Sequence, residues 1–572
     1  MYDSLNHLAA DPVGRAPRSS ATLVLVRESP AGPEVLLLRR AERGDHNSGA
    51  WVFPGGLVDE GDQASAGCCT GVSADEADAR LGVERGGLAY YVAAVRECFE
   101  ECGVLLARSA DGTPVSAAQV AALDAARGPL HRGETTLPAL CAEHGLSLAL
   151  DELAYYAHWR TPVGIPKRFD TRFFAALAPA GQKALHDAAE TVEHRWLRPA
   201  EVLADPAGYK MLTPTLGTLK LIAAHPSAAA FLAWARQPRE VPLTQPRLGS
   251  GSQGKRPVLP EEPAWAELGR LDPEGRGHAS YDIQTDVAVR LSPHVIRVTA
   301  GNGSVMTGPG TNTYLVGGGP NNEWAVIDPG PALPAHVAAV LAAAPGRITQ
   351  ILVTHTHTDH SPACVALKQA TQAPVLGRVA AHPMWQDDSF APDRVLQGGE
   401  RLLVDEGVTL QVFHTPGHAS NHLCFLLEEE KTLFTGDHVM QLSTVVINPP
   451  DGDMRAYIAS LRTLATTLEL DWLAPGHGFL MPRPRQAMEA IVAHRLKREA
   501  KVVDALRRLG PATVDTLLTS VYDDVPPRLH PVALRSLNAH LFKLRDDAAA
   551  VERDALWALA GLSAPAEAPA AR

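Results

Sequence analysis

The sequence predicts a multidomain fold of the α/β and α+β classes. Its 572 residues exceed what one hydrophobic core usually organises, since domains mostly hold about 50–200 residues. Short aliphatic or β-branched runs alternate with helical periodicity in both halves of the chain, which is typical of layered α/β architecture. A stretch rich in Pro, Gly, Ser and charge, residues 236–281, separates the halves and is expected to be a linker.

Composition excludes several classes of protein. With 45% hydrophobic and 20% charged residues, the chain matches an ordinary globular protein. A formal charge of −12 opposes broad, charge-driven nucleic-acid binding, because such binding requires a positive surface. Residues 1–20 hold no signal-peptide core and no run of about 18 apolar residues occurs, so we expect no membrane span and a cytoplasmic location. The seven cysteines form no C-x-x-C pair, which favours reduced thiols.

The front half, residues 20–235, is expected to open with a β-hairpin. Residues 22–26 and 35–38 are two apolar runs, and a Ser-Pro-Ala-Gly-Pro turn separates them. Helical patterns follow, then a strand-like run at residues 169–177 and an alanine-rich helical region after Thr213. This order of elements predicts a sheet with helices packed on it.

A helix in the front half carries three carboxylates on one face. Residues 94–106 have the sequence A-V-R-E-C-F-E-E-C-G-V-L-L, in which Glu97 precedes Glu100 and Glu101 by three and four positions. Like charges at this spacing destabilise a helix, and a hard divalent cation with oxygen ligands removes that penalty. Gly103 is placed to end the helix.

These residues resemble the motif of the Nudix hydrolases, which ends R-E-x-x-E-E-x-G. The residues that match this ending in register are Arg96, Glu97, Glu100, Glu101 and Gly103. Residues 53–62, F-P-G-G-L-V-D-E-G-D, match its start and include Gly56, with Asp62 where the family has glutamate. Residues 63–95 form a far longer spacer than the family standard. With W-R-T-P-x-x-x-P-K-R-F-D-T-R-F-F at residues 159–174, the split motif resembles the peroxisomal coenzyme A diphosphatase branch.

The Nudix resemblance implies an α/β/α sandwich and a site for Mg²⁺ or Mn²⁺. The implied metal ligands are Glu97, Glu100 and Glu101, of which Glu100 and Glu101 are also the catalytic candidates that help to activate water. Arg96 would orient the carboxylates through charge-assisted hydrogen bonds. Glu190 and Glu193 are candidates for a further ligand or base. The implied substrate is a nucleoside diphosphate linked to another group, with coenzyme A or an acyl derivative as the candidate.

In the back half, residues 282–485, potential metal ligands repeatedly follow short apolar strands. The strand-like run that begins at Ile348 leads into four of them: His355, His357, Asp359 and His360. Runs at residues 410–413, 432–435 and 472–474 lead into His418, Asp437 and His477 respectively. Imidazole and carboxylate are ligands that zinc takes, and strand ends are where open α/β sheets usually place their sites. The pattern therefore predicts a metal centre.

The ordered set H-x-H-x-D-H, histidine, aspartate, histidine resembles the metallo-β-lactamase superfamily over residues 285–485. The resemblance implies an αββα sandwich that binds two zinc ions. One ion would be held by His355, His357 and His418, the other by Asp359, His360 and His477, with Asp437 bridging both. Asp328, in V-I-D-P-G, matches an early aspartate of the superfamily and is expected to support the ligands. Two such ions lower the pKa of a shared water toward neutrality and so provide a metal-bound hydroxide, which Asp359 could steer.

Two further segments resemble the β-lactamase-like protein 2 group. P-G-T-N-T-Y-L-V-G at residues 309–317 resembles its entry strand, and residues 486–560 resemble its small, mainly helical winged-helix segment. Some members of that group cleave single-stranded RNA, and the candidates for phosphate contact here are Lys497, Arg498 and Lys501. The chain departs from many relatives after the D-H pair, where Ser361, Pro362 and Ala363 stand in place of two glycines. The last ten residues are expected to form a disordered tail.

Three hypotheses of function follow. The preferred one is a bifunctional hydrolase, in which the Nudix half cleaves a nucleoside-diphosphate-linked compound and the zinc half cleaves an ester, thioester or phosphodiester. Acyl-coenzyme A breakdown is its shared theme, and small nucleotide or coenzyme A derivatives are its expected partners. The second makes the zinc half a single-strand endoribonuclease, which the net acidity does not favour. The third makes the Nudix half a non-catalytic ligand sensor.

Overall fold

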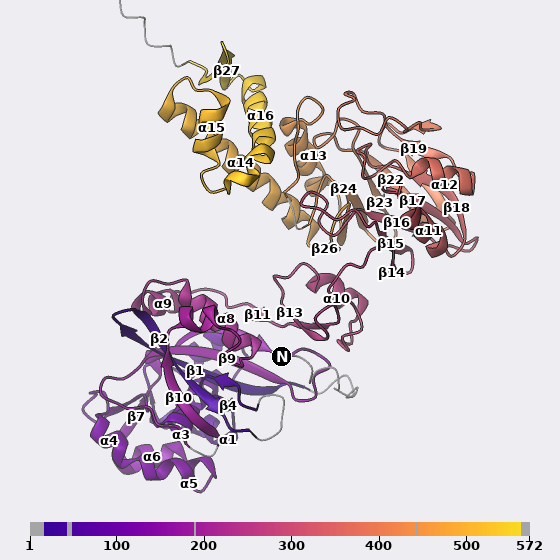
Figure 1. Ribbon diagram of the computed structural model, residues 1–572. Coiled ribbons are helices and arrows are strands. Elements are labelled where there is room, and N and C mark those ends of the chain that lie inside the picture. Colours follow the sequence, from indigo (N-terminus) through magenta and orange to yellow (C-terminus); the bar gives the residue numbers. More distant parts are fainter. Residues whose placement is uncertain (1–15, 43–47, 188–189, 442–443, 562–572) are drawn as a thin grey trace, which may run out of the picture. The chain divides into compact units, whose positions relative to one another are not determined.

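The computed structural model describes residues 16–42, 48–187, 190–441 and 444–561, and the chain divides into two compact units (Figure 1). Unit 1 runs to Trp265 and includes Asp272–Ala279. Unit 2 contains Ala266–Leu271 and the chain from Ser280 onward. The division between the units therefore falls inside the stretch that composition marks as a linker.

Unit 1 is built on a mixed sheet with the strand order β10-β2-β1-β9-β8-β11. The expected hairpin is β1 (Arg18–Ser29) and β2 (Gly32–Arg40), which are antiparallel and turn between Ser29 and Gly32. Strand β9 (Phe169–Leu177) has the bounds that the sequence predicts and lies parallel to β1. The other strands are β3 (Trp51–Val52), β4 (Gly55–Leu57), β8 (Ala154–Arg160), β10 (Thr191–Leu197) and β11 (Leu243–Thr244).

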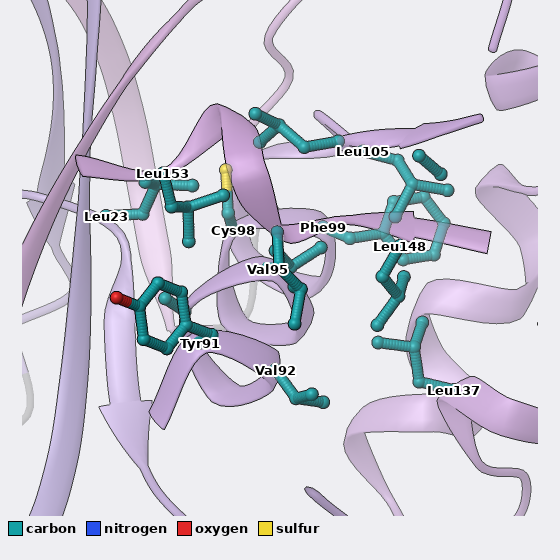
Figure 2. Close-up of a cluster of buried hydrophobic side chains, with 14 of the residues drawn as sticks. Leu23, Tyr91, Val92, Val95, Cys98, Phe99, Leu105, Leu137, Leu148 and Leu153 are labelled. Atoms are coloured by element: carbon teal, nitrogen blue, oxygen red, sulfur yellow. The ribbon is translucent and has the colours of Figure 1, made fainter. Parts of the chain in front are cut away.

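Helix α3 (Gly87–Cys102), which carries the Nudix carboxylates, packs on one face of this sheet. Figure 2 shows Tyr91 and Phe99 of this helix among Leu23 of β1, Leu137 of α6 (Leu137–His144) and Leu148 of β7 (Leu146–Ala149). Strand β7 belongs to a small second sheet with the order β5-β7-β6, formed with β5 (Cys69–Thr70) and β6 (Ala107–Ser109). The long spacer thus contributes β5 and α2 (Ala74–Leu81) to an extra layer around α3.

The opposite face of the main sheet is covered by α7 (Pro199–Ala204), α8 (Thr213–Ala223) and α9 (Ala228–Ala235). Their buried residues share one core with the sheet residues that alternate away from α3. Unit 1 is therefore an α/β/α sandwich, as predicted. In the part of the chain that the structure describes, no single helix is long and apolar enough to cross a membrane, and α8 with α9 meets that test only as a bent pair.

The stretch expected to be a linker carries secondary structure of its own. Strand β11 pairs with β8, β12 (Arg247–Gly249) pairs with β13 (Arg256–Val258), and α10 (Trp265–Leu271) follows. In α10, Glu267 is 2% exposed and accepts two hydrogen bonds from Arg297, at 2.8 and 2.9 Å. Composition does not predict these elements, because isolated buried residues and the Glu267–Arg297 ion pair hold them in place. Neither leaves a periodic apolar run in the sequence.

Removal of the Glu267 carboxylate is expected to destabilise unit 2, because Arg297 would keep a buried charge without its partner. Glu267→Ala should lower the free energy of unfolding by about 3–5 kcal/mol. Hydrogen exchange of β15 (Val295–Thr299) in the intact chain measures this change. The double variant Glu267→Leu/Arg297→Leu is the control and should recover much of the loss. If Glu267→Ala lowers the free energy of unfolding by less than about 1 kcal/mol, the ion pair contributes no more than a solvated surface pair does, which would contradict this prediction.

Unit 2 holds two sheets that face each other. The first has the order β14-β15-β16-β17-β18-β19-β20 and the second the order β21-β22-β23-β24-β25-β26. The further bounds in the first sheet are β14 (Ala288–Arg290), β16 (Asn312–Gly317), β17 (Glu323–Ile327), β18 (Arg347–Leu352), β19 (Val375–Gly377) and β20 (Arg394–Val395). Those in the second are β21 (Arg401–Asp405), β22 (Val408–His414), β23 (Leu423–Leu427), β24 (Thr432–Gly436), β25 (Trp472–Pro475) and β26 (Met481–Pro482). One apolar core joins the inner faces.

Helices cover the outer faces of both sheets. Helices α11 (Pro334–Ala343) and α12 (Cys364–Thr371) pack on the first sheet, where they lie together in Figure 1. Helices α13 (Met454–Thr467) and α14 (Pro484–Leu509) pack on the second. This arrangement is the predicted αββα sandwich.

The C-terminal part of unit 2 has a small core of its own. It comprises the end of α14, then α15 (Val514–Val521), α16 (His530–Asp546) and the hairpin of β27 (Ala550–Arg553) and β28 (Leu556–Leu559). The periodicity of the sequence predicts the helices but not the hairpin, whose strands are only four residues long each. The expected tail lies outside the described residues.

Candidate active sites

The predicted ligands of the back half come together where strands of both sheets end. The segment after β18 supplies His355, His357, Asp359 and His360, and the segments after β22, β24 and β25 supply His418, Asp437 and His477. Burial removes most of these side chains from solvent, and Asp359, with 25% of its side chain exposed, is the most accessible of the carboxylates. The chain thus brings seven residues from distant positions into one cluster.

Three imidazoles form the first group of this cluster. His357 Nδ1 lies 3.0 Å from His355 Nε2 and 3.0 Å from His418 Nε2. His418 Nδ1 lies 2.7 Å from the carbonyl oxygen of Val446, so Nδ1 carries the proton and Nε2 offers its lone pair to the cluster. Burial and the neighbouring histidines lower the pKa of His355 far below its usual value and that of His357 to about 3, so both rings are neutral.

Asp359, His360 and His477 form the second group. Asp359 Oδ2 lies 3.5 Å from His360 Nε2 and 3.4 Å from His477 Nε2. His477 Nδ1 faces the carbonyl oxygen of Gly310 at 3.0 Å, which fixes the ring so that Nε2 points into the cluster. Burial disfavours a charge on His477, but Asp437 and Asp359 outweigh it and raise the pKa of His477 to about 9. The second group is thus a centre of negative potential that attracts cations.

Asp437 lies between the two groups. Its Oδ1 is 3.4 Å from His360 Nε2 and 3.2 Å from His477 Nε2, and its Oδ2 is 3.6 Å from His418 Nε2. Asp437 Oδ1 and His360 Nε2 are buried, and neither has a hydrogen-bond partner among the described residues. Buried polar atoms without partners are costly, and a bound cation would give both atoms a partner. The donor set therefore fits metal ions of the kind that imidazole and carboxylate bind.

Asp328 supports the second group through the ring nitrogen of His360 that faces away from the cluster. Its carboxylate accepts hydrogen bonds from the Thr354 backbone N–H at 2.7 Å and the Thr354 hydroxyl at 2.8 Å. Asp328 Oδ2 also lies 3.0 Å from His360 Nδ1. This fixes the tautomer of His360 and directs its Nε2 into the cluster, which is the geometry that a supporting role for Asp328 requires.

His422 adds a layer that the sequence pattern does not predict. Its ring is fully buried and lies 5.0 Å from the ring of His355 at an interplanar angle of 27°. Thr415 Oγ1 lies 3.0 Å from its Nδ1. Only the fold places it against the ligands, because neither strand periodicity nor a neighbouring glycine marks it.

Arg96 is the centre of the Nudix site. Its Nε and Nη2 donate to the carboxylate of Asp62 at 2.8 and 2.9 Å. Its Nη1 donates to Glu97 at 2.9 Å and to Glu100 at 3.3 Å. Asp62 belongs to the start of the split motif and the glutamates to its end. One guanidinium therefore joins both parts of the motif in spite of the long spacer.

Strand β4, beside α3, has glycines where the glutamate carboxylates approach it. A Cβ on Gly56 would lie 2.3 Å from Glu97 Oε1, so a larger residue there would displace the Glu97 carboxylate. The Gly55 N–H donates to Glu101 at 3.1 Å. Gly103 ends α3 with φ 70°, as expected. Among the described residues, the oxygens of Glu97, Glu100 and Glu101 do not gather as closely as the back-half ligands do, because Arg96 and Gly55 each hold some of them.

Glu190 and Glu193, the candidates for a further metal ligand or base, differ in their surroundings. Glu190 Oε1 lies 3.9 Å from His131 Nε2, and His131 Nδ1 lies 3.4 Å from Glu100 Oε2. Glu193 instead pairs with Arg195 at 2.5 Å. Glu190 is thus linked to the carboxylate cluster and Glu193 is directed away from it. His131, from α5 (Arg127–His131), carries no sequence signal that would have marked it.

The metal-free Nudix site is expected to lose stability as pH rises, because burial, with the Glu100 charge, outweighs Arg96 and raises the pKa of Glu97 from 4.5 to about 7. A folded pKa above the unfolded one gives stability that is complete below pH 4.5 and lost as pH rises through 7. The loss is at most about 3 kcal/mol. Melting of the chelated protein at pH 5 and pH 8, beside Glu97→Gln, measures it. A variant profile that matches the wild type would contradict this assignment.

Three family models match the chain, in the order in which the domains occur. They are the NUDT19 Nudix domain over residues 70–211, the metallo-beta-lactamase superfamily over residues 306–477 and the beta-lactamase associated winged helix domain over residues 513–557. A solved NUDIX hydrolase from Alicyclobacillus acidocaldarius is 27% identical, with a TM-score of 0.32, over 38% of this chain and 96% of that chain.

Curated relatives match at higher identity. The "Atrochrysone carboxyl ACP thioesterase" of Aspergillus chevalieri is 34% identical over 278 residues, which are 45% of this chain and 83% of the relative. The "Lactamase-like protein vrtG" of Penicillium aethiopicum is 34% identical over 276 residues, with the same coverage of 45% and 83%. The chain therefore belongs to the metallo-β-lactamase superfamily, as a hydrolase that carries a NUDT19-type Nudix domain ahead of the lactamase domain and an associated winged helix behind it.

Proposed function

We propose that the lactamase domain is a zinc-dependent thioesterase for acyl groups carried on phosphopantetheine, the arm shared by coenzyme A and acyl carrier proteins. The observation that carries the proposal is the convergence of His355, His357 and His418 at 3.0 Å beside Asp437. The relative named as an ACP thioesterase supports a thioester as the substrate class. The fused Nudix domain, which resembles coenzyme A diphosphatases, supports the same carrier.

Each residue has a distinct task in this proposal. His355, His357 and His418 would hold one zinc ion, Asp359, His360 and His477 the other, and Asp437 both. When bound, the ions would polarise the thioester carbonyl and lower the pKa of a water. Asp359, with the most exposed carboxylate, would take the proton of the attacking water and return it to the sulfur of the leaving thiol.

Metal analysis and thiol release test the proposal together. The purified protein should contain two zinc ions per chain and release free thiol from acetyl-, malonyl- or octanoyl-coenzyme A. Chelation should abolish the release, and added Zn²⁺ should restore it. Zinc-loaded protein that releases no thiol from any of these thioesters, yet hydrolyses bis-p-nitrophenyl phosphate, would contradict the thioesterase proposal and favour a phosphodiesterase.

We also propose that the Nudix domain hydrolyses the diphosphate of coenzyme A or its acyl derivatives with Mg²⁺ or Mn²⁺. The observation that carries this is the Arg96 guanidinium, which holds Asp62, Glu97 and Glu100 in one network across the split motif. The carboxylates of Glu97, Glu100 and Glu101 supply the oxygen ligands that such cations prefer.

Single-stranded RNA is less well supported as a substrate of the lactamase domain. Arg498 pairs with Asp524 at 2.9 Å, and Lys501 pairs with Asp523 at 2.8 Å. Two of the three candidate phosphate contacts are therefore neutralised by neighbouring carboxylates, and the net charge is negative.

A further inference from the structure

We propose that residues 378–387, here called the rim loop, form with Arg535 of the winged helix the subsite for the phosphorylated pantetheine arm. Trp385 would contact the arm and Arg535 its phosphate. The inference rests on the proposed thioesterase function and names how that site selects its substrate. The rim loop follows β19, and Arg535 lies on α16, within the same unit.

The inner side of the rim loop is tied to the metal cluster. Gln386 Oε1 accepts a hydrogen bond from the Thr356 hydroxyl at 2.5 Å, and the Asp387 N–H donates to the Thr356 carbonyl at 2.7 Å. Thr356 stands between His355 and His357, and the backbone of Gln386 forms a β-bridge with His357. The residue next to Trp385 is therefore in direct backbone contact with a predicted ligand.

Two more ligand-bearing segments hold the rim loop. The Ser361 hydroxyl donates to Asp387 Oδ2 at 2.6 Å, immediately after the ligand His360. The Ala381 N–H donates to Ser420 Oγ at 2.8 Å, two residues after His418. These two hydrogen bonds fix the rim loop at the edge of the metal cluster.

The outer side of the rim loop exposes large apolar side chains. Val379, Met384 and Trp385 are 64%, 53% and 57% exposed. Trp385 has φ 72°, a conformation that is rare for bulky residues and that clusters at ligand-binding sites. Apolar side chains gathered in solvent beside a reaction centre favour contact with an apolar part of a ligand.

Arg535 supplies a positive charge to this surface. Its guanidinium carbon lies 5.2 Å from the centroid of the Trp385 ring, and none of the described carboxylates pairs with it. Arg498 of the same domain, by contrast, is paired with Asp524. A guanidinium stacked on an aromatic ring and free of acidic partners is well suited to phosphate.

The ligand must therefore present an apolar segment and an anion within reach of the metal cluster. The phosphopantetheine arm does so, since its branched dimethyl carbon lies next to its phosphate and the thioester lies at its other end. A simple fatty ester would leave Arg535 without a counter-charge. Coenzyme A and acyl carrier proteins share this arm, and both are included in the test.

The test compares substrates with and without the phosphate. Octanoyl-coenzyme A, octanoyl-acyl carrier protein and octanoyl-pantetheine are hydrolysed by wild type, Arg535→Gln and Trp385→Ala. Arg535→Gln should raise KM for the two phosphorylated substrates roughly 10–100-fold, through loss of a charge-assisted contact, and leave octanoyl-pantetheine unchanged. Trp385→Ala should raise KM for all three. A larger shift for one phosphorylated substrate identifies the natural carrier.

Matched controls and a binding measurement separate the subsite from the fold. Arg553→Gln, on β27, removes the same charge from the winged helix, and Leu403→Ala removes a 66% exposed side chain on β21; neither should change KM. Calorimetry with pantetheine 4′-phosphate should show weaker binding to Arg535→Gln at unchanged zinc content.

Two different results would overturn the two proposals. Equal KM changes in Arg535→Gln for octanoyl-coenzyme A and octanoyl-pantetheine would overturn the phosphate subsite and leave the thioesterase proposal standing. Zinc-loaded wild type that cleaves none of the three thioesters would overturn the thioesterase proposal itself.

Discussion

Asp437→Asn is expected to remove at least one zinc ion and to lower kcat/KM for thioester hydrolysis by about 10³-fold, which corresponds to roughly 4 kcal/mol. Asp437 is the one carboxylate within 3.6 Å of both groups among the described residues, through Oδ2 to His418 and Oδ1 to His360 and His477. An amide presents one neutral oxygen in place of two charged ones. Metal analysis beside the thiol-release assay measures both effects.

Asp405→Asn is the matched control for Asp437→Asn. Asp405 is 2% exposed and accepts hydrogen bonds from Asn321 and from the Glu323 N–H, at one end of β17. Its replacement removes a buried carboxylate of the same unit and should lower stability while zinc content and activity persist. An Asp437→Asn protein that retains two zinc ions and full activity would exclude a bridging role.

The residues of the back-half cluster could be predicted because the local sequence marks each of them. Every one follows an apolar run that is a strand in the structure, as β18 precedes His355 and β24 precedes Asp437. The apolar run defines the strand, and the polar residue after it lies at the sheet edge. His422 was not predictable, because only the packing of the two sheets brings it against His355.

Residues 236–281 are a case in which composition predicts the wrong structure. Their Pro and Gly content predicts a linker, yet Glu267 in α10 is buried against Arg297, thirty residues further along the chain. A single ion pair leaves no periodic signal in the sequence. The rim loop is a similar case, since the Ser361–Asp387 and Trp385–Arg535 contacts join residues whose spacing follows no regular period.

The split Nudix motif lies between these cases. The sequence places Glu97, Glu100 and Glu101 on one helix face, and α3 carries them there. Sequence alone does not say whether Asp62 and Arg96, which are 34 residues apart, still meet. The structure shows that they do, because the spacer folds into α2, β5 and neighbouring turns and returns the chain to the start of α3.

Glu100→Gln/Glu101→Gln is expected to abolish hydrolysis of coenzyme A in the presence of Mg²⁺, with a loss of kcat/KM of about 10³-fold or more. Both side chains are buried, at 5% and 8% exposure, so each amide removes a charge that solvent cannot replace. Burial raises the pKa of both carboxyls, which makes a cation the natural partner of their ionised forms. Chromatographic separation of the two halves of cleaved coenzyme A measures turnover.

The same protein carries the controls for this double variant. Thiol release by the lactamase domain should be unchanged, which shows that unit 2 is unaffected. Glu143→Gln, at an exposed residue of α6, should keep full diphosphatase activity. Turnover that survives in the double variant would exclude Glu100 and Glu101 as the metal-binding carboxylates. Wild type that binds coenzyme A in calorimetry but never cleaves it would instead make the Nudix domain a sensor, because an intact Arg96 network would then hold ligand without supplying the chemistry.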